Sequence, residues 1–219
     1  MIERLLMFNP AIGCELPKKE RKEMKILPLD QLQTFFAAAK EHGCYEMFYF
    51  ELATGLRRGE LFGLKWGDID FQTGAIRIQR QVQRLDGKVQ ETKLKTSNSY
   101  RTILVDQDIL NMLLTMKTER KIESDYVFCS PTGGILEPGS QRKRLQRLLE
   151  SCGMEKIRFH DLRHTFATLT LQNGVDVKTL SGLLGHYSAG FTLDTYGHIS
   201  TQMQQDAAQK VGGFLRMNM

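Results

Sequence analysis

Residues 159–168 read F-H-D-L-R-H-T-F-A-T, and the chain continues with L-L-G-H at 183–186 and D-T-Y-G-H at 194–198. His160 and Arg163 are three positions apart, so on a helix they project from the same face and can reach one anion. Tyr196 follows ten residues after His186. A tyrosine hydroxyl is a poor nucleophile until another group stabilises its charge or accepts its proton. This stretch therefore supplies a candidate nucleophile together with its candidate activators.

A basic pair occurs upstream in A-T-G-L-R-R-G-E at 53–60. Thr54-Gly55 predicts the end of one helix, and Arg57 then lies at the start of the next. Exposed amides at a helix start, together with a guanidinium group, favour a bound phosphate. Arg58 is the alternative for this role. Glu60 would share a helix face with Arg57 and orient its side chain, or else it is a solvated surface charge.

A lysine occurs in K-L-K-T-S-N-S-Y-R-T-I at 93–103, a segment that predicts a polar turn followed by a strand. Lys95 lies in this turn. A lysine in a flexible turn can move toward a substrate and donate a proton, although most turn lysines are simply solvated. Lys93 is the competing residue, but the K-T-x-x-S-x-R-T-I context favours Lys95.

These motifs, in this order, resemble the tyrosine recombinase (phage-type integrase) family, and the resemblance covers the chain from about Lys25 onward. The catalytic domain of that family carries Arg, Lys, His-x-x-Arg, His and Tyr. The corresponding residues here are Arg57, Lys95, His160, Arg163, His186 and Tyr196. The family's arginine directly follows Gly-Leu, which favours Arg57 over Arg58. We expect Arg57 and Arg163 to bind the phosphate oxygens, and His160 and His186 to hydrogen-bond the same phosphate or accept the tyrosine proton. The resemblance implies that Tyr196 attacks DNA to form a 3′-phosphotyrosyl link and that Lys95 protonates the departing 5′ oxygen.

Hydrophobic periodicity predicts a mainly α-helical chain with a small antiparallel β-sheet, an α+β fold. The predicted helices cover 29–43, 45–53, 106–120, 140–152, 160–174 and 177–184. The predicted strands cover 75–82, 88–92 and 100–105, with Asp86-Gly87 as a hairpin turn. The resemblance implies the DNA breaking-rejoining catalytic domain fold.

Three segments are expected. Residues 1–24 form an N-terminal segment and linker, 25–200 the catalytic domain, and 201–219 a C-terminal helix of the kind that relatives exchange between protomers. Relatives usually carry an N-terminal DNA-binding domain before such a linker. We expect this chain to be a catalytic domain alone.

The composition is that of an ordinary globular protein with a net charge of +5, which agrees with a nucleic-acid partner. The densest basic run lies on the predicted helix 140–152. We expect it to follow a DNA backbone, although a charge run also suits a solvated face. The candidate DNA-binding residues are Arg58, Arg142, Lys143, Arg144 and Arg147. The four cysteines form no C-x-x-C pair and indicate reduced thiols. No carboxylate cluster or nucleotide-binding loop occurs, so we expect neither a metal nor a cofactor.

The expected function is site-specific DNA recombination that integrates or excises a mobile element. The implied partners are double-stranded DNA at recombination sites, a homotetramer on that DNA, and an excisionase or a host DNA-bending protein. No apolar run has membrane-spanning length, so we expect an intracellular protein. The resemblance implies a cytoplasmic, nucleoid-associated protein of a bacterium. The alternatives are a type IB topoisomerase, a catalytically idle regulator, and a helical DNA-binding protein without chemistry. The intact set of six residues disfavours the idle regulator, and the T-G-L-R and L-G-H contexts favour the integrase over the topoisomerase.

Overall fold

The structure is a computed structural model that describes residues 13–14, 24–94, 99–186, 190, 192–193, 195–196, 208, 211, 213 and 216. Lys95, most of the predicted linker and most of the predicted C-terminal helix lie outside these residues. The helices are α1 (Leu32–Glu41), α2 (Tyr45–Thr54), α3 (Arg58–Gly63), α4 (Gln107–Glu119), α5 (Pro138–Ser151), α6 (Phe159–Gln172) and α7 (Val177–Leu184). The strands are β1 (Ile69–Asp70), β2 (Ala75–Ile78), β3 (Arg80–Leu85), β4 (Lys88–Lys93) and β5 (Arg101–Leu104), and two 3₁₀ turns cover Leu29–Gln31 and Trp66–Asp68.

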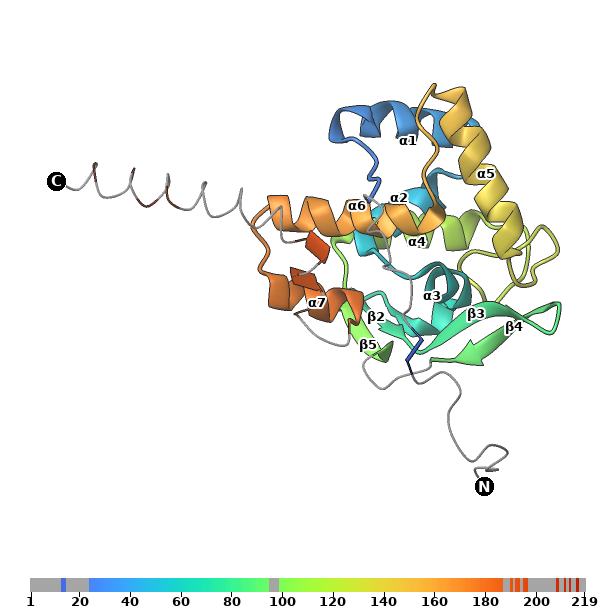
Figure 1. The fold of residues 1–219 in the computed structure, drawn as a ribbon. Coiled ribbons are helices and arrows are strands. Elements are labelled where there is room, and N and C mark those ends of the chain that lie inside the picture. The colour runs from blue at the N-terminus through green and yellow to red at the C-terminus, as the bar shows by residue number, and fades with distance from the viewer. Residues whose placement is uncertain are drawn as a thin grey trace.

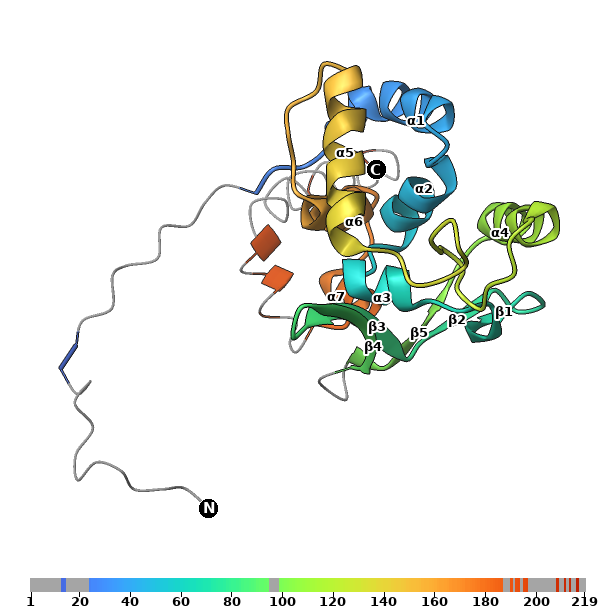
Figure 2. The ribbon, with the colours of Figure 1, turned by 90° about the vertical axis from the view of Figure 1, so that its right-hand side faces the viewer.

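Helix α6 crosses the middle of the molecule and contacts both α2 and α7 (Figure 1). In this view α1 lies above α6 and α5 runs down the right-hand side, whereas α3 and the strands lie below α6. Figure 2 shows the β3–β4 hairpin beside α3, and these two elements are in contact. Helix α7 also contacts β5. The segment that carries His160 and Arg163 is therefore held between the helical part of the molecule and the strands.

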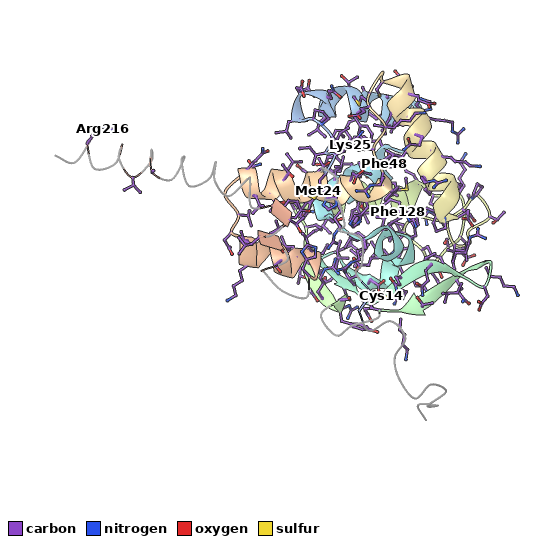
Figure 3. All side chains as sticks on the ribbon, in the orientation of Figure 1. Cys14, Met24, Lys25, Phe48, Phe128 and Arg216 are labelled. Atoms are coloured by element: carbon purple, nitrogen blue, oxygen red, sulfur yellow. The ribbon has the colours of Figure 1, made fainter. Side chains whose placement is uncertain are left out.

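A series of aromatic rings fixes the first turn of α6. Phe35 of α1 contacts Phe48 of α2 with ring centroids 5.6 Å apart, and Phe48 contacts Phe159 at 6.0 Å. Phe62 of α3 contacts Phe159 from another side at 5.7 Å. All four side chains are buried, and Phe48 lies inside the molecule in Figure 3. Because aromatic rings bury a large area and pack in preferred geometries, this series places the start of α6 firmly against α2 and α3.

The predicted helices are confirmed, with small changes at their ends. Asp106 caps α4, because its side chain accepts a hydrogen bond from the Ile109 amide at 2.9 Å. Helix α5 begins at Pro138, two residues before the predicted start, since proline suits the first turn of a helix. Gly185 ends α7 in the left-handed conformation, with φ of 62°. All four cysteines are free thiols.

The predicted strand 75–82 is wrong as a single element. It divides at Gln79 into β2 and β3, which belong to two different antiparallel sheets. Strand β2 pairs with β1 and β5, whereas β3 pairs with β4 across the Asp86-Gly87 turn. Side chains at the break bond to buried Asp68, because Gln79 donates to Asp68 Oδ1 and Arg80 forms an ion pair with Asp68. The short strand β1 has no counterpart among the predicted strands.

Gly55 satisfies two constraints that a residue with a side chain would violate. It ends α2 with φ of 59°, a conformation that costs other residues strain. A Cβ atom at this position would lie 2.1 Å from Cδ1 of Phe166 on α6. The close approach of α2 and α6 therefore depends on the missing side chain.

We expect Gly55→Ala to lower the free energy of unfolding by at least about 1–2 kcal/mol, the cost of the left-handed conformation alone. The displaced Phe166 ring adds to this loss. Urea denaturation measures the change. Gly67→Ala is the matched control, because a Cβ atom at Gly67 would meet nothing within 4 Å. Equal midpoints for the two variants would contradict the constraint at Gly55.

Candidate active site

Three arginine side chains from distant parts of the chain converge on the C-terminal end of α7. The three hydrogen bonds run from Arg101 Nε to Leu183 O (2.6 Å), from Arg163 Nη2 to Leu184 O (2.6 Å) and from Arg57 Nη2 to Gly185 O (2.8 Å). Carbonyls at the end of a helix lack intrahelical partners and carry partial negative charge. The arginines satisfy these carbonyls and thereby fix the position of the next residue, His186.

Arg163 is the most deeply buried of the three, with 2% of its surface exposed. Its Nη1 also donates to Gly55 O at 2.8 Å, so it joins the ends of α2 and α7. Burial, followed by the charge of Arg57, lowers the pKa of Arg163 to about 9. The guanidinium group stays protonated at neutral pH. Its positive charge is poorly compensated, however, and an anion bound beside it would offset the free-energy cost of burying that charge.

Glu60 is the carboxylate that links Arg57 to Arg101. Its oxygens accept bonds from Arg57 Nη1 at 2.8 Å and from the Arg57 amide at 3.0 Å. Arg101 donates to both oxygens, at 2.8 Å and 3.2 Å. Burial alone raises the pKa of Glu60, but the hydrogen bonds and charges of Arg101 and Arg57 outweigh it and lower the pKa below 4.5. Glu60 is 2% exposed, which excludes the solvated surface charge.

Glu51 of α2 is a second buried carboxyl group, with no exposed surface. Neither of its oxygens has a hydrogen-bond partner among the described residues. Burial raises the pKa of Glu51 well above its ordinary value, although the charge of Arg163 opposes this. Burial thus disfavours the ionised form of Glu51. Two carboxyl groups, Glu51 and Glu60, lie near three guanidinium groups, so the site keeps an excess of positive charge in either protonation state of Glu51.

His160 and His186 are both neutral in this environment. Desolvation of the ring, followed by the charges of His164 and Arg163, lowers the pKa of His160 to about 4. Burial, followed by the charges of Arg163 and Arg57, lowers the pKa of His186 to about 4. His186 Nδ1 shares a hydrogen bond with Thr192 Oγ1 at 2.8 Å. Both histidines therefore lie within the electrostatic influence of Arg163, and each can donate one N–H to an anion.

Tyr196 is buried beside these groups, with 2% of its surface exposed. It belongs to a small apolar cluster between α6 and α7, formed with Ala167, Leu171, Leu180 and Leu184. Its hydroxyl group forms a hydrogen bond of 2.6 Å with Nδ1 of His164. Burial raises the pKa of Tyr196 to about 12, and the charge of Arg163 acts in the opposite direction. The phenol is therefore protonated at neutral pH.

A basic groove runs between α5 and the segment that leads into α6, with a cavity volume of about 720 Å³. Its lining residues are Arg142, Lys143, Gln146, Arg147, Lys156, Ile157 and Arg158. Arg58 lies in a separate hollow of about 480 Å³ beside the β3–β4 hairpin, which it shares with Arg84 and Arg142.

Arg144 differs from its basic neighbours on α5. Its Nη2 donates to the backbone oxygens of His42 and Gly43, each at 2.8 Å. It thus joins α5 to the turn between α1 and α2, and its guanidinium group is occupied by protein carbonyls.

Sequence reasoning missed four residues of this region: Arg101, Lys156, Arg158 and His164. For two of them, the spacing in the sequence indicates the position of the side chain. Arg101 lies two positions before buried Ile103 on β5, so its side chain shares the inward face of the strand. His164 lies four positions after His160, so it follows on the same face of α6. Lys95 lies outside the described residues.

Within the part of the chain that the structure describes, no helix is long and apolar enough to cross a membrane. In the same residues, no three or more His, Cys, Asp or Glu side chains group in a way that suits a metal ion.

Residues 25–203 match the phage integrase family, and the chain therefore belongs to that family. It is 28% identical to a "tyrosine recombinase XerC-like" protein of Caldanaerobacter subterraneus subsp. tengcongensis, covering 94% of this chain and 60% of the relative. It is also 28% identical to the ICEBs1 integrase of Bacillus subtilis, covering 97% and 61%. The chain thus spans about three fifths of the length of these curated relatives. The Tn1549 transposon integrase, solved with transposon right end DNA, superposes with a TM-score of 0.77 at 21% identity, covering 90% of this chain and 69% of the other.

We expect Glu60→Gln to lower the free energy of unfolding at pH 7 by about 3 kcal/mol, because it leaves the buried guanidinium group of Arg101 and the partly exposed one of Arg57 without their carboxylate. The folded-state pKa of Glu60 lies below 4.5, so its stabilising effect is complete above pH 4.5 and is lost as the pH falls through the folded-state value. The difference between wild type and variant should shrink correspondingly in acid. Urea denaturation at a series of pH values measures it. Exposed Glu119→Gln is the control, and a pH-independent difference for Glu60→Gln would contradict the assignment.

Proposed function

We propose that this chain carries out site-specific DNA strand cleavage and rejoining through a covalent link between Tyr196 and a DNA 3′ phosphate. The observation that carries the proposal is the excess positive charge held by Arg57, Arg101 and Arg163 beside a buried tyrosine. Family membership, which the comparison establishes, supports the same chemistry.

A phosphodiester under attack spreads negative charge over its non-bridging oxygens, and fixed positive donors stabilise that charge. We assign this role to Arg57 and Arg163, since one guanidinium group can donate hydrogen bonds to two phosphate oxygens at once. Their bonds to Gly185 O and Leu184 O hold them in place before DNA arrives. Such preorganised donors need little rearrangement during the reaction. Neutral His160 and His186 add hydrogen-bond donors for the same phosphate.

We assign the covalent step as follows. The Tyr196 oxygen attacks phosphorus, the bond to the 5′ oxygen breaks, and we assign Lys95 to protonate that oxygen. The resulting 3′-phosphotyrosyl link conserves the energy of the broken bond. A 5′ hydroxyl from a second strand can therefore reverse the step and join DNA in a new arrangement.

The basic groove offers a path for the DNA backbone. Arg142, Lys143 and Arg147 are carried by α5, and Lys156 and Arg158 face the same cavity. Side chains of this kind neutralise phosphates and release counterions. The hollow that contains Arg58 would receive an adjacent part of the backbone. Arg144 is assigned a structural role.

The assembly on DNA is a homotetramer that joins two recombination sites of a mobile element, assisted by an excisionase or a host DNA-bending protein. The lambda integrase dimer bound to a core site supports the binding of more than one protomer to DNA. Acting on chromosomal DNA, the protein would work at the bacterial nucleoid. Residues 25–200 form the catalytic domain, and 201–219 form the C-terminal helix that protomers exchange.

We expect wild-type protein to form a covalent adduct with nicked suicide duplexes tiled across the DNA on either side of its gene. Tyr196→Phe should form no adduct while it keeps DNA affinity within about twofold, because it loses only the nucleophile. Arg163→Lys should slow adduct formation by about 10²–10³, since it keeps the charge but loses paired donors. Denaturing gels resolve the adducts. An adduct with Tyr196→Phe would show that another residue is the nucleophile.

We expect the double change Arg142→Gln and Arg147→Gln to reduce the slope of log binding constant against log salt by about 2, close to 0.9 for each phosphate that the protein no longer neutralises. Fluorescence anisotropy with a duplex of arbitrary sequence, between about 50 and 200 mM salt, measures the slope. Lys178→Gln is the control, because α7 lies away from α5 (Figure 1). An unchanged slope in the double variant would remove the groove from the DNA path.

A further inference from the structure

The hydroxyl group of Tyr196 already has a hydrogen-bond partner, His164, and this contact has a chemical consequence that rests on the proposed function. The Tyr196 oxygen lies 2.6 Å from His164 Nδ1, and the two ring centroids are 5.9 Å apart. The phenol must lose its proton when its oxygen bonds to phosphorus. An acceptor within hydrogen-bond distance of the attacking oxygen is the geometric requirement for a general base.

The protonation states determine the direction of this hydrogen bond. Burial raises the pKa of Tyr196 to about 12, and burial lowers the pKa of His164. The phenol therefore keeps its proton and donates it toward His164 Nδ1, while the imidazole is neutral and carries its own proton on Nε2. Each group is then in the form that a proton transfer from oxygen to nitrogen requires.

The other two histidines of the site have different contacts. His186 Nδ1 shares its bond with Thr192 Oγ1 at 2.8 Å. His160 contacts the His164 ring edge-on, with centroids 4.8 Å apart, one helical turn nearer the start of α6. His164 is the histidine in contact with the reacting atom of the nucleophile.

We infer that His164 is a catalytic residue that accepts the Tyr196 proton during DNA cleavage. As the bond between the tyrosine oxygen and phosphorus forms, the phenol proton moves to His164 Nδ1 and gives an imidazolium ion. The bond from phosphorus to the 5′ oxygen breaks, and that oxygen takes a proton from Lys95. On rejoining, His164 returns its proton to the tyrosine oxygen as the phosphotyrosyl bond breaks.

The charged groups around His164 tune its basicity in both directions. Burial has the largest effect and lowers the pKa of His164. The negative charge of Asp161 raises this pKa, whereas the charges of Arg158 and Arg163 lower it further. His160 faces the ring from α6, and His186 lies within its electrostatic influence. Because the pKa of His164 lies below 6.5, the base is already neutral above that pH. Wild-type cleavage should therefore rise with pH only in acid and become flat between about pH 7 and pH 9.

His164→Asn is the decisive variant, because an asparagine side chain places a hydrogen-bonding atom near the position of Nδ1 but does not take up a proton. With the suicide duplexes described above, we expect single-turnover cleavage to fall by about 10²–10⁴. The remaining rate should rise about tenfold per pH unit up to about pH 9, since solvent must then remove the phenol proton. A merely structural role would lower the rate without changing the shape of this profile.

Two further measurements separate the base from the acid and from a folding defect. In a duplex with sulfur in place of the bridging 5′ oxygen, the leaving group needs no proton. The sulfur should therefore restore the cleavage rate of the Lys95→Ala variant but not that of the His164→Asn variant. In His164→Gly, added imidazole should restore cleavage in proportion to its neutral form. The flat profile of the wild-type protein tests the inference without any variant.

The outcomes distinguish this inference from the proposed function. A wild-type adduct together with a normal rate and a flat profile for His164→Asn would overturn the role of His164 and leave the proposed function standing. A wild-type rate that keeps rising between about pH 7 and pH 9 would also overturn it. The absence of any wild-type adduct on every tiled duplex would overturn the proposed function itself, and the role of His164 with it.

Discussion

The structure depends on the bonds between three arginine side chains and the last carbonyls of α7. Leu183, Leu184 and Gly185 are consecutive, and each accepts a hydrogen bond from a different arginine. The partial negative charge of the helix end compensates guanidinium groups that would otherwise be costly to bury. The same bonds hold α7 against α2, α3 and β5. One set of interactions therefore fixes both the fold around the site and the donors within it.

Among the residues that the structure describes, the site contains fewer carboxyl groups than guanidinium groups. Glu60 is the carboxylate between Arg57 and Arg101, whereas burial disfavours the ionised form of Glu51. Burial lowers the pKa values of His160 and His186, and the positive charge of Arg163 lowers them further. A site whose positive charges were all paired with carboxylates would be more stable, but a bound phosphate would stabilise it little further. The aromatic and apolar core that surrounds α6 offsets the cost of holding these charges without an anion.

Much of the fold was predictable because the helices have strong local signals. Asp106 and Gly185 mark helix ends by their own chemistry. The division of the predicted strand 75–82 was not predictable, because its cause is the contact of Gln79 and Arg80 with Asp68, a tertiary interaction. The motifs named the residues that could bind a phosphate. They did not reveal Arg101, whose partner Glu60 lies 41 positions away in the sequence.

Helix α6 explains why the proposed phosphate-binding residues and Tyr196 can be separate in sequence yet adjacent in space. Its first turn presents His160, and Arg163 reaches from the same turn to the end of α7. Its next turn presents His164 to the Tyr196 hydroxyl, and Ala167 and Leu171 then pack against the tyrosine itself. Residues at spacings of three and four share one helix face, so the spacing H-x-x-R-H places phosphate donors and a tyrosine partner one turn apart. In the proposed reaction, the Tyr196 oxygen attacks a phosphate held by Arg163 while its proton is in contact with His164.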